Sequence, residues 1–367
     1  MDKPRIIAFY LPQFYPTKEN DEWWGKGFTE WTNVGRAKPL FKGHYQPRVP
    51  ADLGYYDLRL PEVREQQAEL AREAGIEGFC YWHYWFGNGK RLLDRVFSEV
   101  VESGKPDYPF CLCWANHSWY QKTWDPTKPD KLLIEQTYPG TEDYVAHFNE
   151  MLPAFKDKRY MKVNGKLIFG VFAPLDIPDF KLFKDTWNRL AKENELSGFC
   201  FFGYLPTPSQ EKQVLNDYDY VCVDFYSDVI RYKNIFLKRC LTWIKAKLFR
   251  QPRVAPYKYY VNYVAKHLSE DKRVVPCLLP NYDHTPRSGY RGVLFHSATP
   301  KLFRKLLINI FVKRSNIPKE ENIIFLKAWN EWGEGNYLEP DLVYGRKYLE
   351  AIKDSLNFIE RSKQNLH

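Results

Sequence analysis

The chain has 367 residues, of which 44% are hydrophobic and 27% charged, so it can bury a large core and is neither disordered nor of low complexity. Its net charge of +9 is local, because residues 229–273 hold twelve Lys or Arg and two acids. No recognised motif accompanies this charge, so we predict no nucleic-acid partner. Aromatic residues make up 17%, and the surplus of Trp and Tyr suits stacking on flat apolar faces such as sugar rings.

The sequence carries no pattern of a membrane span or a secretory signal. No run reaches the roughly 18 apolar residues that a span needs, and the run Ile6–Leu11 is shorter than the core of a signal peptide. We therefore predict a cytoplasmic protein. Six of the seven cysteines lie in apolar runs without a CxxC pair, which predicts buried thiols. Because HExxH, DxDxDG and clustered histidines are absent, we predict no metal and no cofactor.

Eight apolar runs alternate with amphipathic patterns, which predicts a parallel sheet with crossover helices. The predicted strands are Ile6–Gln13, Glu77–Tyr84, Phe110–Ala115, Leu167–Phe172, Gly198–Tyr204, Tyr220–Tyr226, Val274–Pro280 and Ile323–Trp329. The clearest helices are Pro61–Ala74, Arg91–Ser103, Asp143–Phe155, Phe180–Asn194, Lys301–Arg314 and Tyr344–Arg361. Since no glycine-rich phosphate loop follows the first strand, this pattern favours a (β/α)8 TIM barrel over an open doubly wound sheet.

Two insertions lengthen this barrel, Tyr15–Leu60 after the first strand and Val229–Arg273 after the sixth. We predict one catalytic (β/α)8 domain over residues 1–367, with 229–273 as a basic amphipathic insertion within it. In this insertion Phe236, Cys240, Ile244 and Leu248 recur every four residues among Lys and Arg, as in a basic amphipathic helix. Such a helix either covers the barrel flank or makes peripheral contact with an anionic inner membrane.

Barrel enzymes carry their chemistry where the strands end, and here these positions mix polar groups with Trp and Tyr, as carbohydrate sites do. We predict substrate contacts from Tyr10, Gln13, His83, Trp85, Trp114, Asn116, His117, Trp119, Asp224, Tyr226, Asn281, Asp283, Asn330 and Trp332. A core histidine is the alternative for His83, and structural hydrogen bonding is the alternative for Asp224 and Tyr226. Trp23 and Trp24 either contact substrate or hold the first insertion on the barrel.

The segment Ala328-Trp-Asn-Glu-Trp-Gly-Glu-Gly335 places Glu331 and Glu334 three residues apart in a turn bracketed by glycines. Paired carboxylates cleave glycosidic bonds, with one donating a proton while the other acts on the opposite side. Crowding and the neighbouring tryptophans predict that one of the two has a raised pKa. The alternative is that both are surface acids on a final loop.

Several motifs, Tyr10-Leu-Pro-Gln-Phe, the Trp-rich segment 21–33, Gly43-His-Tyr-Gln-Pro, Cys111-Leu-Cys-Trp-Ala-Asn116, 329–335 and Tyr337-Leu-Glu-Pro, together resemble the WbsX-like family. That family occurs in bacterial polysaccharide and O-antigen clusters, is often named for glycosyltransferases and is similar to the endo-α-mannosidases of glycoside hydrolase family 99. The resemblance implies that Glu331 takes the proton of the sugar 2-hydroxyl, forming a 1,2-anhydro sugar, and that Glu334 is the acid of a retaining reaction. His117 departs from the family pattern, which usually has Glu there.

These observations favour a retaining glycoside hydrolase acting on an oligosaccharide or polysaccharide, lipid-linked if the basic insertion binds membrane. The alternative is a glycosyltransferase or transglycosylase of surface polysaccharide biosynthesis. Nucleotide-sugar transferases often carry a DxD motif at the carboxyl end of a strand, whereas Asp217-Tyr-Asp219 precedes the sixth predicted strand. A catalytically inactive glycan-binding module would lack one carboxylate, yet both are present.

Overall fold

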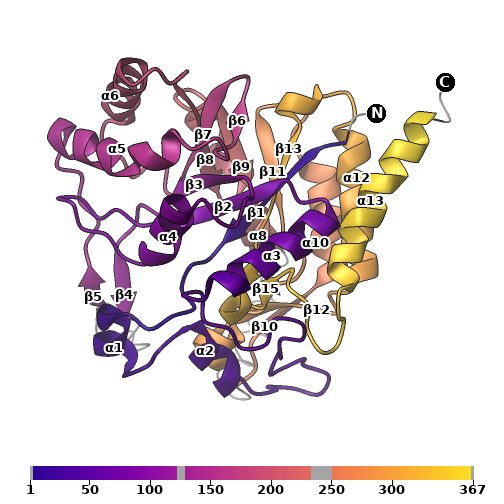
Figure 1. Ribbon diagram of the computed structural model, residues 1–367. Helices are drawn as coiled ribbons and strands as arrows, with labels where there is room; N and C mark the ends of the chain where they lie inside the picture. Colours follow the sequence, from indigo (N-terminus) through magenta and orange to yellow (C-terminus); the bar gives the residue numbers. More distant parts are fainter. Residues whose placement is uncertain (1–2, 122–128, 233–249, 365–367) are drawn as a thin grey trace.

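The computed structural model describes residues 3–121, 129–232 and 250–364, and its centre is a closed barrel of parallel strands (Figure 1). Each barrel strand pairs with the next along the chain, β3 pairs with β7, and β13 returns to β1. The (β/α)8 prediction is therefore confirmed. The barrel strands are β1 (Arg5–Tyr10), β2 (Gly78–His83), β3 (Phe110–Trp114), β7 (Lys166–Val171), β8 (Phe199–Leu205), β9 (Tyr220–Val223), β11 (Val274–Leu278) and β13 (Ile323–Leu326).

Aromatic side chains fill the barrel interior. Phe9 stacks on Trp82 with ring centroids 4.5 Å apart and on Phe325 at 5.2 Å, while Phe172 stacks on Tyr204 at 5.1 Å. Strands covered on both faces must be apolar throughout, which explains the continuous hydrophobic runs in the sequence. The six described cysteines are buried and free, as predicted.

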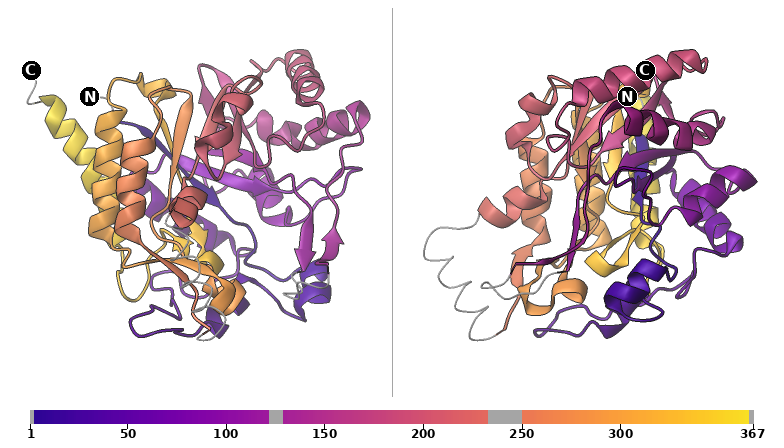
Figure 2. Two further views of the ribbon diagram at one scale, coloured as in Figure 1. Left: turned by 180° about the vertical axis from the view of Figure 1, so that it is seen from behind. Right: turned by 90° about the vertical axis from the view of Figure 1, so that its left-hand side faces the viewer.

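Helices cover the outside of the barrel, and three of them, α3, α12 and α13, lie side by side along one flank (Figures 1 and 2). Helix α3 begins with Pro61 and ends at Ala74, and Gly75 after it has a positive φ of 85°, which favours glycine. The covering helices are α3 (Pro61–Ala74), α4 (Arg95–Ser103), α5 (Thr141–Phe155), α6 (Phe180–Glu193), α10 (Tyr257–His267), α12 (Pro300–Lys313) and α13 (Lys347–Gln364).

The helices of the first insertion lie at the end of the barrel where the strands terminate (Figure 1). They are α1 (Lys18–Trp24) and α2 (Glu30–Arg36), and beside α1 lies the antiparallel pair β4 (Trp119–Gln121) and β5 (Lys131–Ile134). Within 229–273 the structure describes β10 (Arg253–Pro256) and α10, whose Tyr260 and Val264 are buried. The predicted amphipathic helix around 236–248 lies outside the described residues. No helix of the described ranges is long and apolar enough to cross a membrane.

Shorter elements complete the described chain. They are β6 (Lys162–Val163), α7 (Glu211–Val214), α8 (Tyr226–Tyr232), α11 (Thr285–Ser288), β12 (Val293–His296), β14 (Asn330–Glu331), β15 (Asn336–Tyr337) and the 3-10 helices η1 (Pro208–Gln210), η2 (Gly289–Arg291), η3 (Lys319–Glu321) and η4 (Trp332–Glu334).

Candidate active site

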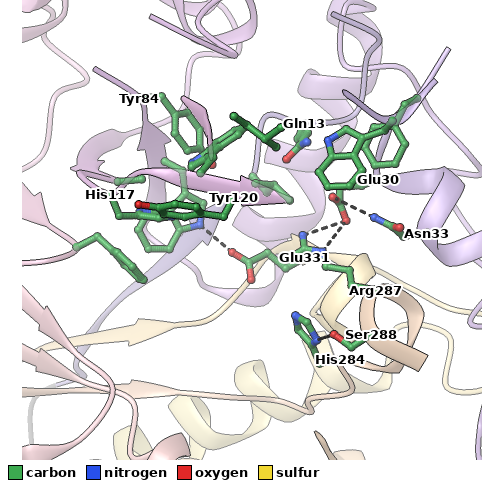
Figure 3. A pocket seen from close by; sticks show the side chains of 18 of the residues that line it. Gln13, Glu30, Asn33, Tyr84, His117, Tyr120, His284, Arg287, Ser288 and Glu331 are labelled. Carbon is green, nitrogen blue, oxygen red and sulfur yellow. Dashed lines mark hydrogen bonds and ion pairs between the residues drawn. The ribbon is translucent and has the colours of Figure 1, made fainter. Parts of the chain in front are cut away.

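A cavity of about 600 Å³ opens at the carboxyl ends of the barrel strands. Trp82, one of the last two residues of β2, and Phe172 and Lys327, which directly follow β7 and β13, line it together with side chains of the first insertion and the β4–β5 hairpin. The cavity also contains Glu331 (Figure 3). Aromatic groups lie at its edge, since Trp24 is 42% exposed and Tyr120 is 50% exposed. This is the mixture of flat apolar surfaces and polar groups that ligand cavities use.

The two carboxylates predicted from the sequence lie together in the turn that follows β13. Glu331, on β14, accepts a hydrogen bond from the Trp82 indole nitrogen at 2.8 Å. Glu334, on η4, accepts one from Arg287 Nη1 at 2.6 Å, and Gly335 closes the turn with a positive φ of 54°. Both acids are therefore held by donors rather than solvated on a surface loop.

The surroundings of the two carboxylates separate their pKa values. Burial raises the pKa of Glu331 to about 7, and the negative charge of Glu334 adds to this effect. Burial also opposes ionisation of Glu334, but the positive charges of Arg287 and Lys327 outweigh it and lower its pKa to about 2. A pair of titratable groups split in this way is typical of acid–base sites.

Arg287, on α11, binds a second carboxylate that sequence reasoning missed. Its Nη2 and Nε lie 3.0 and 3.2 Å from Oε2 of Glu30, the first residue of α2 (Figure 3). Glu30 is only 3% exposed. The Trp-rich motif 21–33 contained Glu30 and so offered a signal for it, whereas nothing in the sequence distinguished Arg287 from other arginines.

Of the predicted contact residues, Gln13, His117 and Trp119 line the cavity with Glu331. Burial lowers the pKa of His117, and its Nδ1 is buried without a hydrogen-bond partner. Trp119 packs edge-on against Trp23, with ring centroids 6.0 Å apart. Trp23 therefore holds the first insertion against the β4–β5 hairpin, while Trp24 faces the cavity.

Three predicted contacts, His83, Trp85 and Trp114, instead surround His147 behind the barrel wall. The Nε2 atoms of His83 and His147 are 2.7 Å apart, and the Trp85 ring stacks on His147 at 4.7 Å. The Trp114 indole donates to the Trp85 carbonyl at 2.8 Å. His83 thus matches its alternative description, a core histidine, and none of the three lines the described cavity.

Four more of the residues predicted to contact substrate make hydrogen bonds within the protein instead. The Tyr10 hydroxyl donates to Gln67 at 2.6 Å, and the Asn330 amide bonds both backbone groups of Leu11. Asn116 similarly ties two loops together through Ala173. The Trp332 indole donates to Glu339 at 2.6 Å, behind the carboxylate turn.

The remaining predicted residues, Asp224, Tyr226, Asn281 and Asp283, do not line the cavity. Asp224 accepts hydrogen bonds from the Tyr204 hydroxyl and from the backbone nitrogen of Tyr226, the first residue of α8. Asp283 and Asn281 are held by the segment that contains Gly43-His-Tyr-Gln-Pro. These contacts are His44 and Gln46 to Asp283 at 2.7 and 2.8 Å, and Arg48 to Asn281 at 2.7 Å. Because the backbone nitrogen of Asp283 donates to the Glu334 carbonyl at 2.6 Å, this segment fixes the carboxylate turn.

Lys327 is a further buried cation of the site. It directly follows β13, lines the cavity, and has Nζ 3.4 Å from the Tyr204 hydroxyl. Burial opposes its charge, but Glu331 and Glu334 outweigh this and raise its pKa. Its place at the end of a predicted strand was the sequence signal for this residue, which was not among the predicted site residues.

A closed parallel barrel with a carboxylate pair and aromatic side chains at its strand ends defines the class of barrel seen in many glycoside hydrolases. Residues 6–352 match the family described as Glycosyltransferase WbsX, and the chain therefore belongs to this family. The chain is 33% identical to the uncharacterized protein WxcX of Xanthomonas campestris pv. campestris over 96% of its own length. It spans about half, 49%, of the length of this relative and of the WxcX protein of a second strain.

Two solved structures share the fold. A glycoside hydrolase-like protein superimposes with a TM-score of 0.62 and 14% identity, covering 97% of this chain and 94% of the other. The GH99 endo-alpha-mannosidase from Bacteroides thetaiotaomicron gives a TM-score of 0.54 and 14% identity, covering 98% of both chains. At this identity the likeness establishes the common barrel.

Proposed function

We propose that the protein is a retaining glycoside hydrolase that acts on an oligosaccharide or polysaccharide through Glu331 and Glu334. The observation that carries the proposal is geometric: Glu331 lines an aromatic-walled cavity at the strand ends, and Glu334 lies three residues further on in the same turn, held by Arg287. A base works best when its pKa is near the working pH, and a pKa of about 7 suits Glu331 for this role.

The proposed reaction has two steps. In the first, Glu331 takes the proton from the sugar 2-hydroxyl, O2 bonds to C1, the bond from C1 to the leaving oxygen breaks, and Glu334 protonates that oxygen. In the second, Glu334 takes a proton from water as the water oxygen bonds to C1, the C1–O2 bond breaks, and Glu331 returns its proton to O2. Two inversions at C1 retain its configuration.

Glycosyl transfer is the second candidate, and the description of the family as glycosyltransferases favours it. The same two carboxylates serve this reaction if a sugar hydroxyl replaces water in the second step. The ratio of hydrolysis to transfer products therefore distinguishes the two candidates without any change in the residue roles.

The test is a panel of α-mannosides and oligosaccharide fragments, with product anomers followed by NMR. On any glycan that is turned over, Glu331→Gln and Glu334→Gln should each lower turnover by about 10²–10⁴-fold, because each removes proton transfer and keeps the side-chain volume. Glu193→Gln, an exposed acid on α6, is the matched control and should behave as the wild type. Near wild-type turnover in either active-site variant would refute the assigned roles.

A further inference from the structure

Arg287 lies between two carboxylates that belong to different parts of the chain. Two nitrogens of Arg287 lie 3.0 and 3.2 Å from Oε2 of Glu30, and a third donates a hydrogen bond to Glu334 at 2.6 Å. Glu30 comes from α2 in the first insertion, and Glu334 comes from the turn after β13. One guanidinium is thus shared between a catalytic candidate and a carboxylate to which the proposed reaction gives no role.

Glu30 is the more firmly placed of the two partners of Arg287. It is 3% exposed, and its backbone nitrogen donates to the Gln13 carbonyl at 3.2 Å. Its Oε2 lies so close to Gly333 that a Cβ at that position would be 2.0 Å away. The side chain of Glu30 is 4% exposed, against 16% for that of Glu334 and 26% for that of Arg287.

The ion pair with Arg287 conflicts with the role that the proposed function gives to Glu334. A cation beside a carboxylate favours the ionised form, whereas a general acid must carry a proton before it can protonate the leaving oxygen. Glu334 therefore has to lose the guanidinium during the cycle. Glu30 offers the guanidinium a second partner within the same site, so it can leave Glu334 without becoming an unpaired buried charge.

We propose that Glu30 is a positioning residue that withdraws Arg287 from Glu334 when a sugar enters the cavity. Glu334 then takes a proton from a hydronium ion of the solvent, which leaves water, and donates a hydrogen bond to the glycosidic oxygen. The ionised, Arg-paired form cannot make that hydrogen bond, so substrate favours the released state. This inference rests on the proposed function. Other charged or titratable groups that face Arg287 or Glu334 are Glu331, Lys327, Asp224, His284, Tyr84, Tyr226 and Tyr282.

The first arm of the test needs no substrate. In protein labelled with ¹³C at the Glu carboxyls, Glu334 is assigned through Glu334→Gln and titrated in the wild type, Arg287→Met and Glu30→Gln. Arg287→Met should raise the titration midpoint of Glu334 by about one to three pH units. Glu30→Gln should leave Glu334 ionised at every pH at which the protein is folded. An unchanged midpoint in Arg287→Met, or a raised midpoint in Glu30→Gln, would overturn the proposal.

The second arm uses a glycan that the wild type turns over. Glu30→Gln should lower kcat at least tenfold with KM within twofold, and the double variant with Arg287→Met should recover at least fivefold of that loss. A purely structural role for Glu30 predicts no recovery, and that result would overturn the proposal. Arg189→Met, which removes an exposed ion pair with Glu193, is the control for losing an arginine. If the wild type turns over no glycan, the proposed function fails, while the Arg287→Met titration still decides whether Arg287 keeps Glu334 ionised.

Discussion

The two carboxylates of the turn differ in their surroundings, and this difference predicts the pH dependence of the reaction. Because Glu331 acts as a base only when ionised and its pKa is about 7, kcat/KM should rise as the pH increases through about 7. Lys327 lowers the pKa of Glu331, so in Lys327→Met this rise of kcat/KM should occur at a pH that is higher by about one unit or more.

The measurement is a profile of kcat/KM from pH 5 to 9 for the wild type, Lys327→Met and the control Lys166→Met. Lys166 is exposed at the opposite end of the barrel, where β7 begins. If kcat/KM falls instead as the pH increases through 7, Glu331 is the proton donor and not the base. If kcat/KM of Lys327→Met rises at the same pH as that of the wild type, Lys327 does not influence the titration of Glu331.

His117 lines the cavity at a position where the family pattern usually has Glu, so we expect it to affect the choice of substrate. His117→Glu places a carboxylate beside the Phe172 ring, whose centroid is 5.1 Å from that of the imidazole. The ratio of kcat/KM between members of a glycan panel should change by about tenfold, equivalent to about 1.4 kcal/mol. His267→Glu, exposed on α10, controls for the added charge. Unchanged ratios would exclude His117 from substrate recognition.

The predicted strand ends showed which residues lie at the carboxyl end of the barrel. They did not show whether each side chain points into the barrel or away from it. Trp82 and His83 are neighbours on β2, yet Trp82 reaches Glu331 inside the barrel and His83 reaches His147 outside it. Successive side chains of a strand face opposite sides, so an error of one residue exchanges cavity for core. This uncertainty did not affect Glu331 and Glu334, because they lie in a turn after the strand.

At the level of elements, the carboxylate turn depends on the close approach of α2. Gly333→Ala would place a methyl group 2.0 Å from Glu30 Oε2 and 3.1 Å from Arg287 Nε, so the turn or the ion pair must move. We expect a loss of about 1–3 kcal/mol in the free energy of unfolding. Because a misplacement of about 1 Å can lower a rate about 100-fold, turnover should fall by a similar factor.

Denaturant unfolding and kcat measure these two effects. Gly35→Ala is the matched control, since Gly35 lies in the same helix α2 with nothing within 4 Å of the added Cβ. Alanine in a helix is favoured over glycine by roughly 0.5–1 kcal/mol, so this variant should be slightly stabilised. Wild-type turnover in Gly333→Ala would show that the turn tolerates displacement of Glu30.

Element boundaries could be predicted at the starts of strands better than at their ends. The predicted strands Val274–Pro280 and Ile323–Trp329 end at Leu278 and Leu326. The residues that follow stay buried, since Leu279 is 1% and Trp329 0% exposed, so the apolar pattern continues after the ladder has ended. Helix α4 begins at Arg95 rather than Arg91, because Arg91 forms a bridge with Trp85.

At the scale of the whole molecule, the positive charge of residues 229–273 predicts contact with an anionic membrane surface. Phe236, Cys240, Ile244 and Leu248 would form the apolar face of a helix whose other faces carry Lys and Arg. Each basic side chain near an anionic surface contributes about 1 kcal/mol. A lipid-linked glycan would then be held beside the enzyme that acts on it.

Co-sedimentation with liposomes tests this prediction. The protein should bind vesicles that contain anionic lipid and not neutral ones, and binding should weaken with added salt because ions screen the attraction. Changing Lys238, Arg239, Lys245 and Lys247 to Glu should abolish binding. The control changes the same number of exposed lysines elsewhere, Lys181, Lys301, Lys305 and Lys353, and should retain it. Equal loss in both variants would mean that net charge alone drives binding, and absence of sedimentation at low salt would leave the basic segment without a membrane role.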